Sequence, residues 1–137
     1  MTPATFARIM DRAYVDMRPW SDADIAQTCA SPHVTLIARP NGAVLVQVLA
    51  GDAEILAFAV DPDAQRSGIA TALLSDALNL AARSGCDRIF LEVATSNDAA
   101  RAFYAARGFA QVGLRKAYYT LRDGTKDDAL LLSRPVA

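Results

Sequence analysis

The most constraining feature of this sequence is an apolar stretch, Glu54 to Val60, followed by a polar loop and then by a long amphipathic pattern. An apolar run of this length is typical of a strand that is covered on both faces and lies centrally in its sheet. Apolar residues then recur along one helical face from Ile69 to Ala81, and Gly85 stands where a left-handed residue ends a helix. A strand and a helix in this order predict an α/β fold.

Further elements follow from apolar spacing, helix caps and turn residues. The predicted helices are Thr5 to Tyr14, Ser21 to about Cys29, and Asp98 to Arg107, which Gly108 closes. The predicted strands are Val34 to Ala38, Ala43 to Leu49, Arg88 to Val93, Phe109 to Arg115 and a short last one, Ala129 to Ser133. Asn41 and Gly42 supply the positive φ angles of a tight hairpin. This order predicts a mixed α/β (α+β) sheet with helices on both faces and a right-handed crossover.

Length and charge narrow the possible function. The chain has 137 residues, enough for a core without a disulfide or metal, so we expect a single domain over residues 1–137. With 14 basic and 15 acidic side chains the net charge is -1, the wrong sign for holding nucleic-acid phosphates. No apolar stretch approaches the ~20 residues of a membrane span, and no secretion signal is recognisable. We therefore expect a cytoplasmic protein, with neither nucleic acid nor membrane as partner, whose Cys29 and Cys86 are reduced.

The loop before the long helix carries the first sign of chemistry. Residues Gln65 to Ala70 read Gln-Arg-Ser-Gly-Ile-Ala and begin a helix, where backbone N–H groups without helical partners favour an anion. Gly68 has no Cβ to keep a phosphate from the backbone, and Ala70 is small, so a pyrophosphate would fit. The spacing is not that of a P-loop, and no Lys follows the glycine. By itself such a short motif is weak evidence.

A second motif lies further along the chain, where Asn97 is followed by Tyr104 and then by Gly108-Phe109. Together with the Val60-Asp61-Pro62 strand end and the loop, it resembles the acyl-CoA-binding motifs of the GNAT acetyltransferases. Further matches are Leu91-Glu92-Val93, Ser96-Asn97, Ala102, Phe103-Tyr104, Tyr118-Tyr119, Asp123-Gly124, Asp128-Ala129-Leu130 and, upstream, Arg18-Pro19-Trp20-Ser21. These make the chain similar to the RimI-type branch, the ribosomal-protein-alanine N-acetyltransferases.

The resemblance implies the GNAT fold, a mostly antiparallel central sheet in which two parallel strands, here Glu54 to Val60 and Arg88 to Val93, splay apart around acetyl-CoA. It implies that backbone groups of Phe58 and Val60 bind the pantetheine amides. The other implied cofactor-binding residues are Gln65, Arg66, Ser67, Gly68, Ile69, Ala70, Asn97 and Tyr104. Arg66 could pair with a CoA phosphate or stay solvated, and Asn97 could cap a helix, contact the cofactor, or do both. The loop departs from close relatives at Ala64 and Ala70, and neither residue blocks phosphate binding by the backbone.

Two catalytic roles follow from the same resemblance. Attack on a thioester needs a neutral amine, and an α-amino group has a pKa near ~8, so a base must take its proton. Glu92 has the matching position; the alternative is a glutamate that points to solvent at a strand end. Tyr104 matches the acid that protonates the departing CoA thiolate, or else is a core tyrosine beside Phe103. Direct transfer is expected, because nothing near Cys86 forms a Cys-His pair.

The remaining polar residues indicate a function less clearly. His33, the one histidine, has no Cys or His at ligand spacing, so we expect a turn residue and no metal site. Tyr118 and Tyr119, with Asp127 and Asp128, could edge a groove for a peptide N-terminus or form a solvated hairpin rim.

The predicted function is acetyl transfer from acetyl-CoA to an N-terminal α-amine of a protein, namely the alanine of a ribosomal protein. One alternative acceptor is a small amine such as a polyamine, an aminoglycoside or an amino acid. A non-catalytic acyl-CoA-binding module is the other alternative, against which the presence of both Glu92 and Tyr104 argues. The acceptor side is formed by the least diagnostic parts of the chain, so the sequence does not fix the acceptor.

Overall fold

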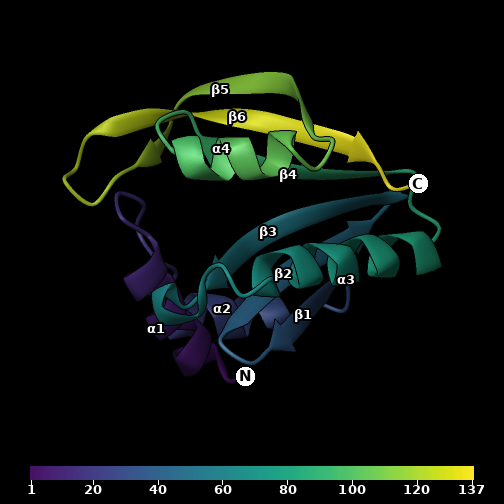
Figure 1. Cartoon of the computed structure of the whole chain (residues 1–137), viewed down its shortest axis with the longest axis horizontal. Helices are drawn as coiled ribbons and strands as arrows, with labels where there is room; N and C mark the ends of the chain where they lie inside the picture. Colours follow the sequence, from purple (N-terminus) through teal and green to yellow (C-terminus); the bar gives the residue numbers. More distant parts are fainter.

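The computed structural model describes residues 1–137, and its six strands form one sheet in the order β1-β2-β3-β4-β6-β5 (Figure 1). The strands are β1 (Val34–Arg39), β2 (Gly42–Leu49), β3 (Asp52–Val60), β4 (Arg88–Ala94), β5 (Ala110–Thr120) and β6 (Lys126–Pro135). The helices are α1 (Pro3–Ala13), α2 (Asp22–Cys29), the single 3₁₀ turn η1 (Pro62–Ala64), α3 (Ile69–Arg83) and α4 (Asp98–Ala105). Neighbouring strands are antiparallel except β3 and β4, which run parallel. The predicted mixed, mostly antiparallel sheet is confirmed.

Local chemistry of the chain sets the helix ends. Side-chain oxygens of Thr2, Ser21 and Asn97 accept hydrogen bonds from backbone N–H groups in the first turns of α1, α2 and α4. At the far end of α3, Gly85 has φ 75°, and the Cys86 N–H donates to the Ala81 carbonyl at 3.0 Å. This pair of features forms a Schellman motif, as predicted from Gly85.

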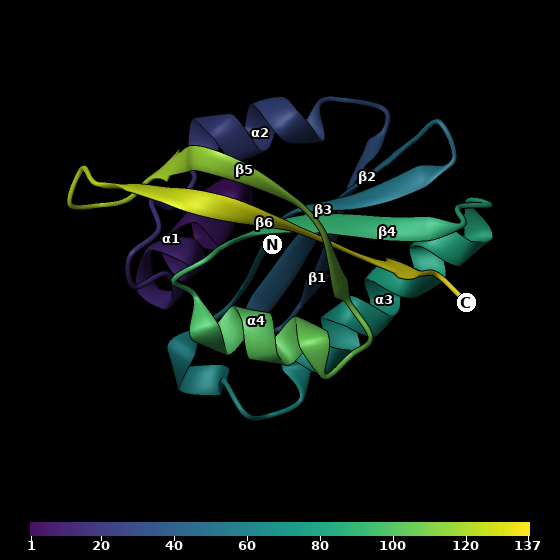
Figure 2. The same ribbon diagram turned by 90° about the horizontal axis from the view of Figure 1, so that it is seen from above.

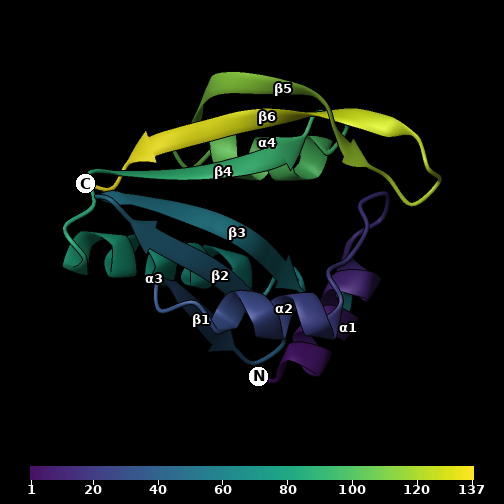
Figure 3. The same cartoon turned by 180° about the vertical axis from the view of Figure 1, so that it is seen from behind.

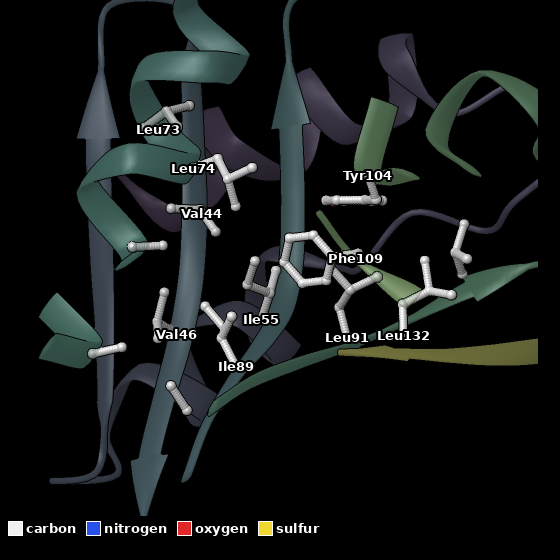
Figure 4. Packing of buried hydrophobic residues seen from close by; sticks show 14 of the residues in the cluster. Val44, Val46, Ile55, Leu73, Leu74, Ile89, Leu91, Tyr104, Phe109 and Leu132 are labelled. Carbon is white, nitrogen blue, oxygen red and sulfur yellow. The ribbon is translucent and has the colours of Figure 1, made fainter. Parts of the chain in front are cut away.

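Helices cover both faces of the sheet, as the sequence predicts. α3 and α4 lie on one face, and α1 and α2 lie on the opposite face over β1 to β3 (Figures 2 and 3). The larger core packs α3 and Tyr104 of α4 against β2, β3, β4 and β6 (Figure 4). The smaller core joins α1 and α2 to the other side of β2 and β3. None of the helices combines the length and the apolar character that a membrane crossing requires.

The two parallel strands separate halfway along their length. Pairing of β3 with β4 extends from Asp52–Arg88 to Ile55–Leu91 and then stops, and Figure 1 shows the two ribbons diverging from there. A β-bulge lies at the same point, because β2 pairs with Ile55 and with Ala57 but leaves Leu56 without a partner. A bulge bends a strand and increases its twist, which turns β3 away from β4. The predicted splay is confirmed and has a local cause.

Some predicted boundaries were wrong. β5 continues to Thr120 and β6 is a ten-residue strand rather than a short one, because Tyr119 pairs with Asp127 and Thr120 with Lys126 beyond a bulge between Arg115 and Tyr119. α4 ends at Ala105 rather than Arg107. The Arg107 N–H donates to the carbonyl of Tyr104, three residues back, so the last turn tightens before Gly108 at φ 89°.

Candidate active site

A cleft of about 440 Å³ lies between the start of α3, the C-terminal half of β3, and α4. It brings together most of the predicted cofactor-binding set: Phe58, Val60, Gln65, Arg66, Gly68, Ile69, Ala70, Asn97 and Tyr104. Of the predicted residues, Ser67 and Glu92 do not line it. The cleft thus joins two sequence motifs that lie some way apart in the chain.

The loop that leads into α3 carries unpaired backbone donors, and all of its residues from 66 to 71 except Ser67 line the cleft. The N–H groups of residues 66–71 make no hydrogen bond within the protein; the Ala72 N–H, which donates to the Gly68 carbonyl at 3.0 Å, is the first of α3 to do so. Arg66 and Gly68 have φ angles of 68° and 86°, which turn the loop so that it leads directly into α3. The Ser67 hydroxyl bonds back to the Ala64 carbonyl, so its side chain braces the loop. A row of free N–H groups at a helix N-terminus fits a phosphate or pyrophosphate.

The unpaired edge of β3 forms the next part of the cleft. Successive residues of a strand direct their backbone groups to alternate edges, and the Asp61 N–H donates toward β2, to the Asn41 carbonyl at 2.7 Å. Phe58 and Val60 therefore point their N–H and C=O groups to the opposite edge, from which β4 has diverged. Side chains already meet both carbonyls, since Tyr14 Oη donates to Phe58 at 3.2 Å and Gln65 Nε2 to Val60 at 3.3 Å. An extended amide chain could hydrogen-bond along this edge.

On the α4 side, Asn97 uses its Oδ1 to accept from the Ala100 N–H at 3.1 Å, so it caps α4 while also lining the cleft. Arg107 was not predicted. Its guanidinium lies 3.8 Å from the centre of the Phe103 ring and donates to the Thr71 hydroxyl at 3.0 Å. Arg107 thereby links α4 to the first turn of α3 across the cleft.

Tyr104 belongs to the core and also borders the cleft. Its ring packs edge-on against Phe103 and Phe109, with centroids 5.3 Å away in both cases. Figure 4 shows Tyr104 and Phe109 in the core. The side chain lines the cleft, and its hydroxyl, which is not fully buried, makes no hydrogen bond within the protein. Burial, aided by the nearby Tyr14 and Tyr119, raises the pKa of Tyr104 well above its usual 10. The phenol is therefore protonated at neutral pH.

Glu92 lies on the opposite face of β4 from the core residues Leu91 and Val93, as the alternating burial of this strand shows. It is the first β4 residue beyond the last pair with β3. Its side chain is 13% exposed, and Oε1 lies 3.4 Å from Nε of Arg115 on β5. Glu92 therefore does not point into solvent, and it sits where the two strands begin to separate.

Other groups gather near Glu92 on the same face. Burial, then the charge of Glu92, raise the pKa of Glu54, while Arg115 lowers it. Burial, then Glu92, also raise the pKa of Tyr119 on β5. Tyr14, from the end of α1, has its pKa raised to about 12, mainly by burial. No local sequence pattern identifies Tyr14 or Arg115, because only the folded sheet brings them to this place.

The two aspartates of the last hairpin hold backbone in place. Asp127 accepts from the Ser96 hydroxyl at 2.6 Å and from the Ser96 N–H at 3.2 Å, which fixes the turn between β4 and α4. Asp128 accepts from the Ala117 N–H at 2.7 Å, inside the β5 bulge. Tyr118 is half exposed at this rim. His33 lies in the turn before β1, as predicted.

Comparison with known proteins agrees with this geometry. Residues 6–109 match the model of the acetyltransferase (GNAT) family, and the chain belongs to that family. The ribosomal protein bS18-alanine N-acetyltransferase of Escherichia coli K12 is 32% identical over 123 residues, covering 87% of this chain and 82% of that protein. The N-alpha-acetyltransferase RimI of Mycobacterium tuberculosis is 37% identical over 123 residues, covering 82% of this chain and 75% of that protein.

Among solved structures, the ribosomal-protein-S18-alanine N-acetyltransferase from Escherichia coli superposes with a TM-score of 0.82 at 30% identity. The superposition covers 96% of this chain and 85% of the other. The family and these relatives make the protein an acetyl-CoA-dependent N-acetyltransferase. The alternative of a non-catalytic acyl-CoA-binding module is therefore dropped.

Proposed function

We propose that residues 1–137 form one catalytic domain that transfers the acetyl group of acetyl-CoA to the N-terminal α-amine of a protein in the cytoplasm. The acceptor we propose is the N-terminal alanine of ribosomal protein bS18, which the names of the Escherichia coli relatives specify for those proteins. The observation that carries the proposal is the gap between β3 and β4. It has the cleft and Tyr104 on one face of the sheet and Glu92 on the other.

In this proposal the chain holds acetyl-CoA by its backbone. The free N–H groups of residues 66–71 bind the pyrophosphate, and the Arg66 guanidinium pairs with a phosphate at the cleft wall. The edge groups of Phe58 and Val60 bind the amides of the pantetheine arm, and Asn97 contacts the arm from the α4 side. This arrangement directs the thioester, which supplies the acetyl group, toward the gap between the strands.

The acceptor amine would approach from the face that carries Glu92. Glu92 takes a proton from the ammonium group, and the neutral nitrogen then attacks the thioester carbonyl carbon. Its pairing with Arg115 at 3.4 Å holds the carboxylate beside the gap. A base in this position is needed because an α-amine is mostly protonated below its pKa of ~8.

On the opposite side, Tyr104 gives its phenolic proton to the sulfur as the C–S bond breaks and the C–N bond forms. Its raised pKa supports this role, because the group is protonated when the thiolate leaves. A free hydroxyl in the cleft is also able to turn toward the sulfur. The nitrogen loses its second proton to solvent as the amide forms, Glu92 releases its proton, and the Tyr104 phenolate takes one up, so the net products are a neutral amide, a free thiol and one released proton.

Intact-mass analysis of the acceptor tests the proposal directly. The purified protein is incubated with acetyl-CoA and a peptide that carries the N-terminal sequence of the host's own bS18, beginning with alanine. We expect one acetyl group on this peptide and none on the same peptide with a blocked α-amine. Acetylation of polyamines, aminoglycosides or amino acids, with no transfer to the peptide, would instead establish a small-molecule acceptor and refute the proposed one.

A further inference from the structure

The last turn of α1 reaches across to the loop that precedes α3. Nη1 of Arg12 donates to Oδ2 of Asp61 at 2.8 Å, and Nη2 donates to Oδ2 of Asp63, also at 2.8 Å. One planar guanidinium thus bridges two carboxylates of a single loop, which fixes the orientation of that loop more tightly than a single contact would.

Apart from Gln65, whose side chain donates to the Val60 carbonyl, and Ala64, which packs against the larger core, the loop has few other ties to the body of the protein. The Asp61 N–H donates to the Asn41 carbonyl at 2.7 Å, and Asp61 Oδ1 accepts from the Asp63 N–H at 3.0 Å. Beyond Asp63 the chain runs through Gln65 into residues 66–71, whose N–H groups have no partner within the protein and which, except for Ser67, line the cleft. The position of these donors therefore depends on how the segment from Asp61 to Asp63 is held.

Exposure indicates that this bridge contributes little to overall stability. The side chains of Arg12 and Asp63 are 49% and 83% exposed, while that of Asp61 is 16% exposed, and ion pairs with such an open arginine have small net energies. A bridge that adds little to the core but spans α1 and the phosphate-facing loop acts mainly on the geometry of that loop.

We propose that Arg12 is a positioning residue for acetyl-CoA, which holds the loop so that the N–H groups of residues 66–71 meet the phosphates. This rests on the proposed binding of the pyrophosphate by those groups. The same turn of α1 also fixes the next part of the cleft, because Tyr14 donates to the carbonyl of Phe58. Arg12 itself does not line the cleft and does not touch the acetyl group or the acceptor.

Calorimetry of CoA binding to Arg12→Gln tests this without any acceptor. We expect the Kd for CoA to rise three- to tenfold, since both ion pairs that hold the loop are lost. Arg12→Lys should give an intermediate Kd, because one ammonium cannot bridge both carboxylates with the same geometry. Arg8→Gln is the matched control, as Arg8 lies one turn earlier in α1 and donates to the Thr5 hydroxyl; it should bind CoA as the wild type does.

A second measurement separates positioning from general damage. S-acetylpantetheine carries the thioester and the pantetheine arm but lacks the pyrophosphate and the nucleotide. With a bS18 peptide as acceptor, Arg12→Gln should raise KM for acetyl-CoA, leave kcat unchanged, and leave kcat/KM for S-acetylpantetheine unchanged. Unaltered CoA affinity, or equal losses with both thioesters, would refute the proposal. If the wild type acetylates no peptide, the proposed acceptor fails, while the calorimetry still decides the role of Arg12.

Discussion

At the scale of single residues, Glu92 and Tyr104 approach the gap between β3 and β4 from opposite faces of the sheet. Glu92→Gln keeps the size of the side chain but removes its ability to take a proton. We expect kcat for the peptide to fall about a hundredfold, the lower end of the range for general base catalysis. Steady-state rates at saturating acetyl-CoA measure this. Glu54→Gln is the control, because it removes a nearby carboxylate that is no base in this mechanism, and equal losses in both variants would refute the role of Glu92.

Tyr104→Phe keeps the ring contacts with Phe103 and Phe109 and removes only the hydroxyl. We expect kcat to fall about ten- to a hundredfold, with CoA affinity within twofold of the wild type. Because burial raises the pKa of Tyr104 above 10, the wild-type rate should show no loss from its ionisation up to about pH 9.5. Rates between pH 7 and 9.5, with CoA titrations, test this. A wild-type rate in the variant would leave Tyr104 as a core residue alone.

Asp127 makes folding stability depend on pH. Hydrogen bonds from Ser96, then from Thr95, lower its pKa from 3.8 to about 2. The carboxylate therefore stabilises the fold above about pH 4, and this contribution is lost as the pH falls toward 2. We expect Asp127→Asn to lose about 1 kcal/mol at pH 7, since the site is partly solvated, and the difference from the wild type to shrink near pH 2. Urea unfolding of the wild type and the variant at several pH values measures the difference.

At the scale of elements, α3 starts close to the sheet because Gly42 has no side chain. A Cβ at Gly42 would lie 3.1 Å from Ile69 Cγ2, 3.1 Å from Leu73 Cδ1 and 3.2 Å from the Ala59 carbonyl. We expect Gly42→Ala to destabilise the protein by about 1–3 kcal/mol and to raise the Kd for CoA, because the first turn of α3 must shift. Gly113→Ala is the control, as its Cβ would meet Leu131 at an ordinary 3.4 Å. Thermal unfolding measures the stability of both variants, and calorimetry measures their Kd for CoA.

The sequence predicts elements well where the signals are local. The end of α3 at Gly85 and the caps at Ser21 and Asn97 depend on neighbouring residues, and all were predicted. The full lengths of β5 and β6 were missed, because the pairing of Tyr119 with Asp127 resumes beyond a bulge and depends on the partner strand. The bulge at Leu56 was also invisible in the sequence, although the family resemblance implied the splay that it produces.

At the scale of the whole molecule, the β5–β6 hairpin is fastened to the connection between α1 and α2. Arg122 in the hairpin donates to the Asp11 carboxylate at 2.9 Å and to the carbonyls of Asp11, Tyr14 and Met17 at 2.8–3.0 Å. We expect Arg122→Gln to raise KM for the peptide several-fold and to leave CoA affinity unchanged, because the hairpin borders the face with Glu92. Lys126→Gln is the control, since Lys126 bonds to Thr120 within the hairpin. A rise in KM for acetyl-CoA instead would contradict this.

The packing of the whole molecule also explains which site residues the sequence could reveal. Residues Gln65 to Ala70 and Asn97 to Tyr104 carry compact motifs, and nearly all of their predicted members line one cleft. Arg12, Tyr14 and Arg115 carry no motif. They reach the site from α1 and β5, at opposite ends of the chain, and only the packing of the sheet brings them near the motif residues.

The short parallel pairing of β3 with β4, from Asp52–Arg88 to Ile55–Leu91, couples the stability of the sheet to the binding of ligand. It joins two half-sheets, β1 to β3 and β4 to β6, whose strands diverge beyond this pairing (Figure 1). A cosubstrate arm laid along the open edge of β3 would continue the ladder that β4 leaves. Ligand that binds the native state alone adds about 2.7 kcal/mol to its stability at a hundred times Kd. The cellular concentration of acetyl-CoA would then set how firmly the two half-sheets stay together.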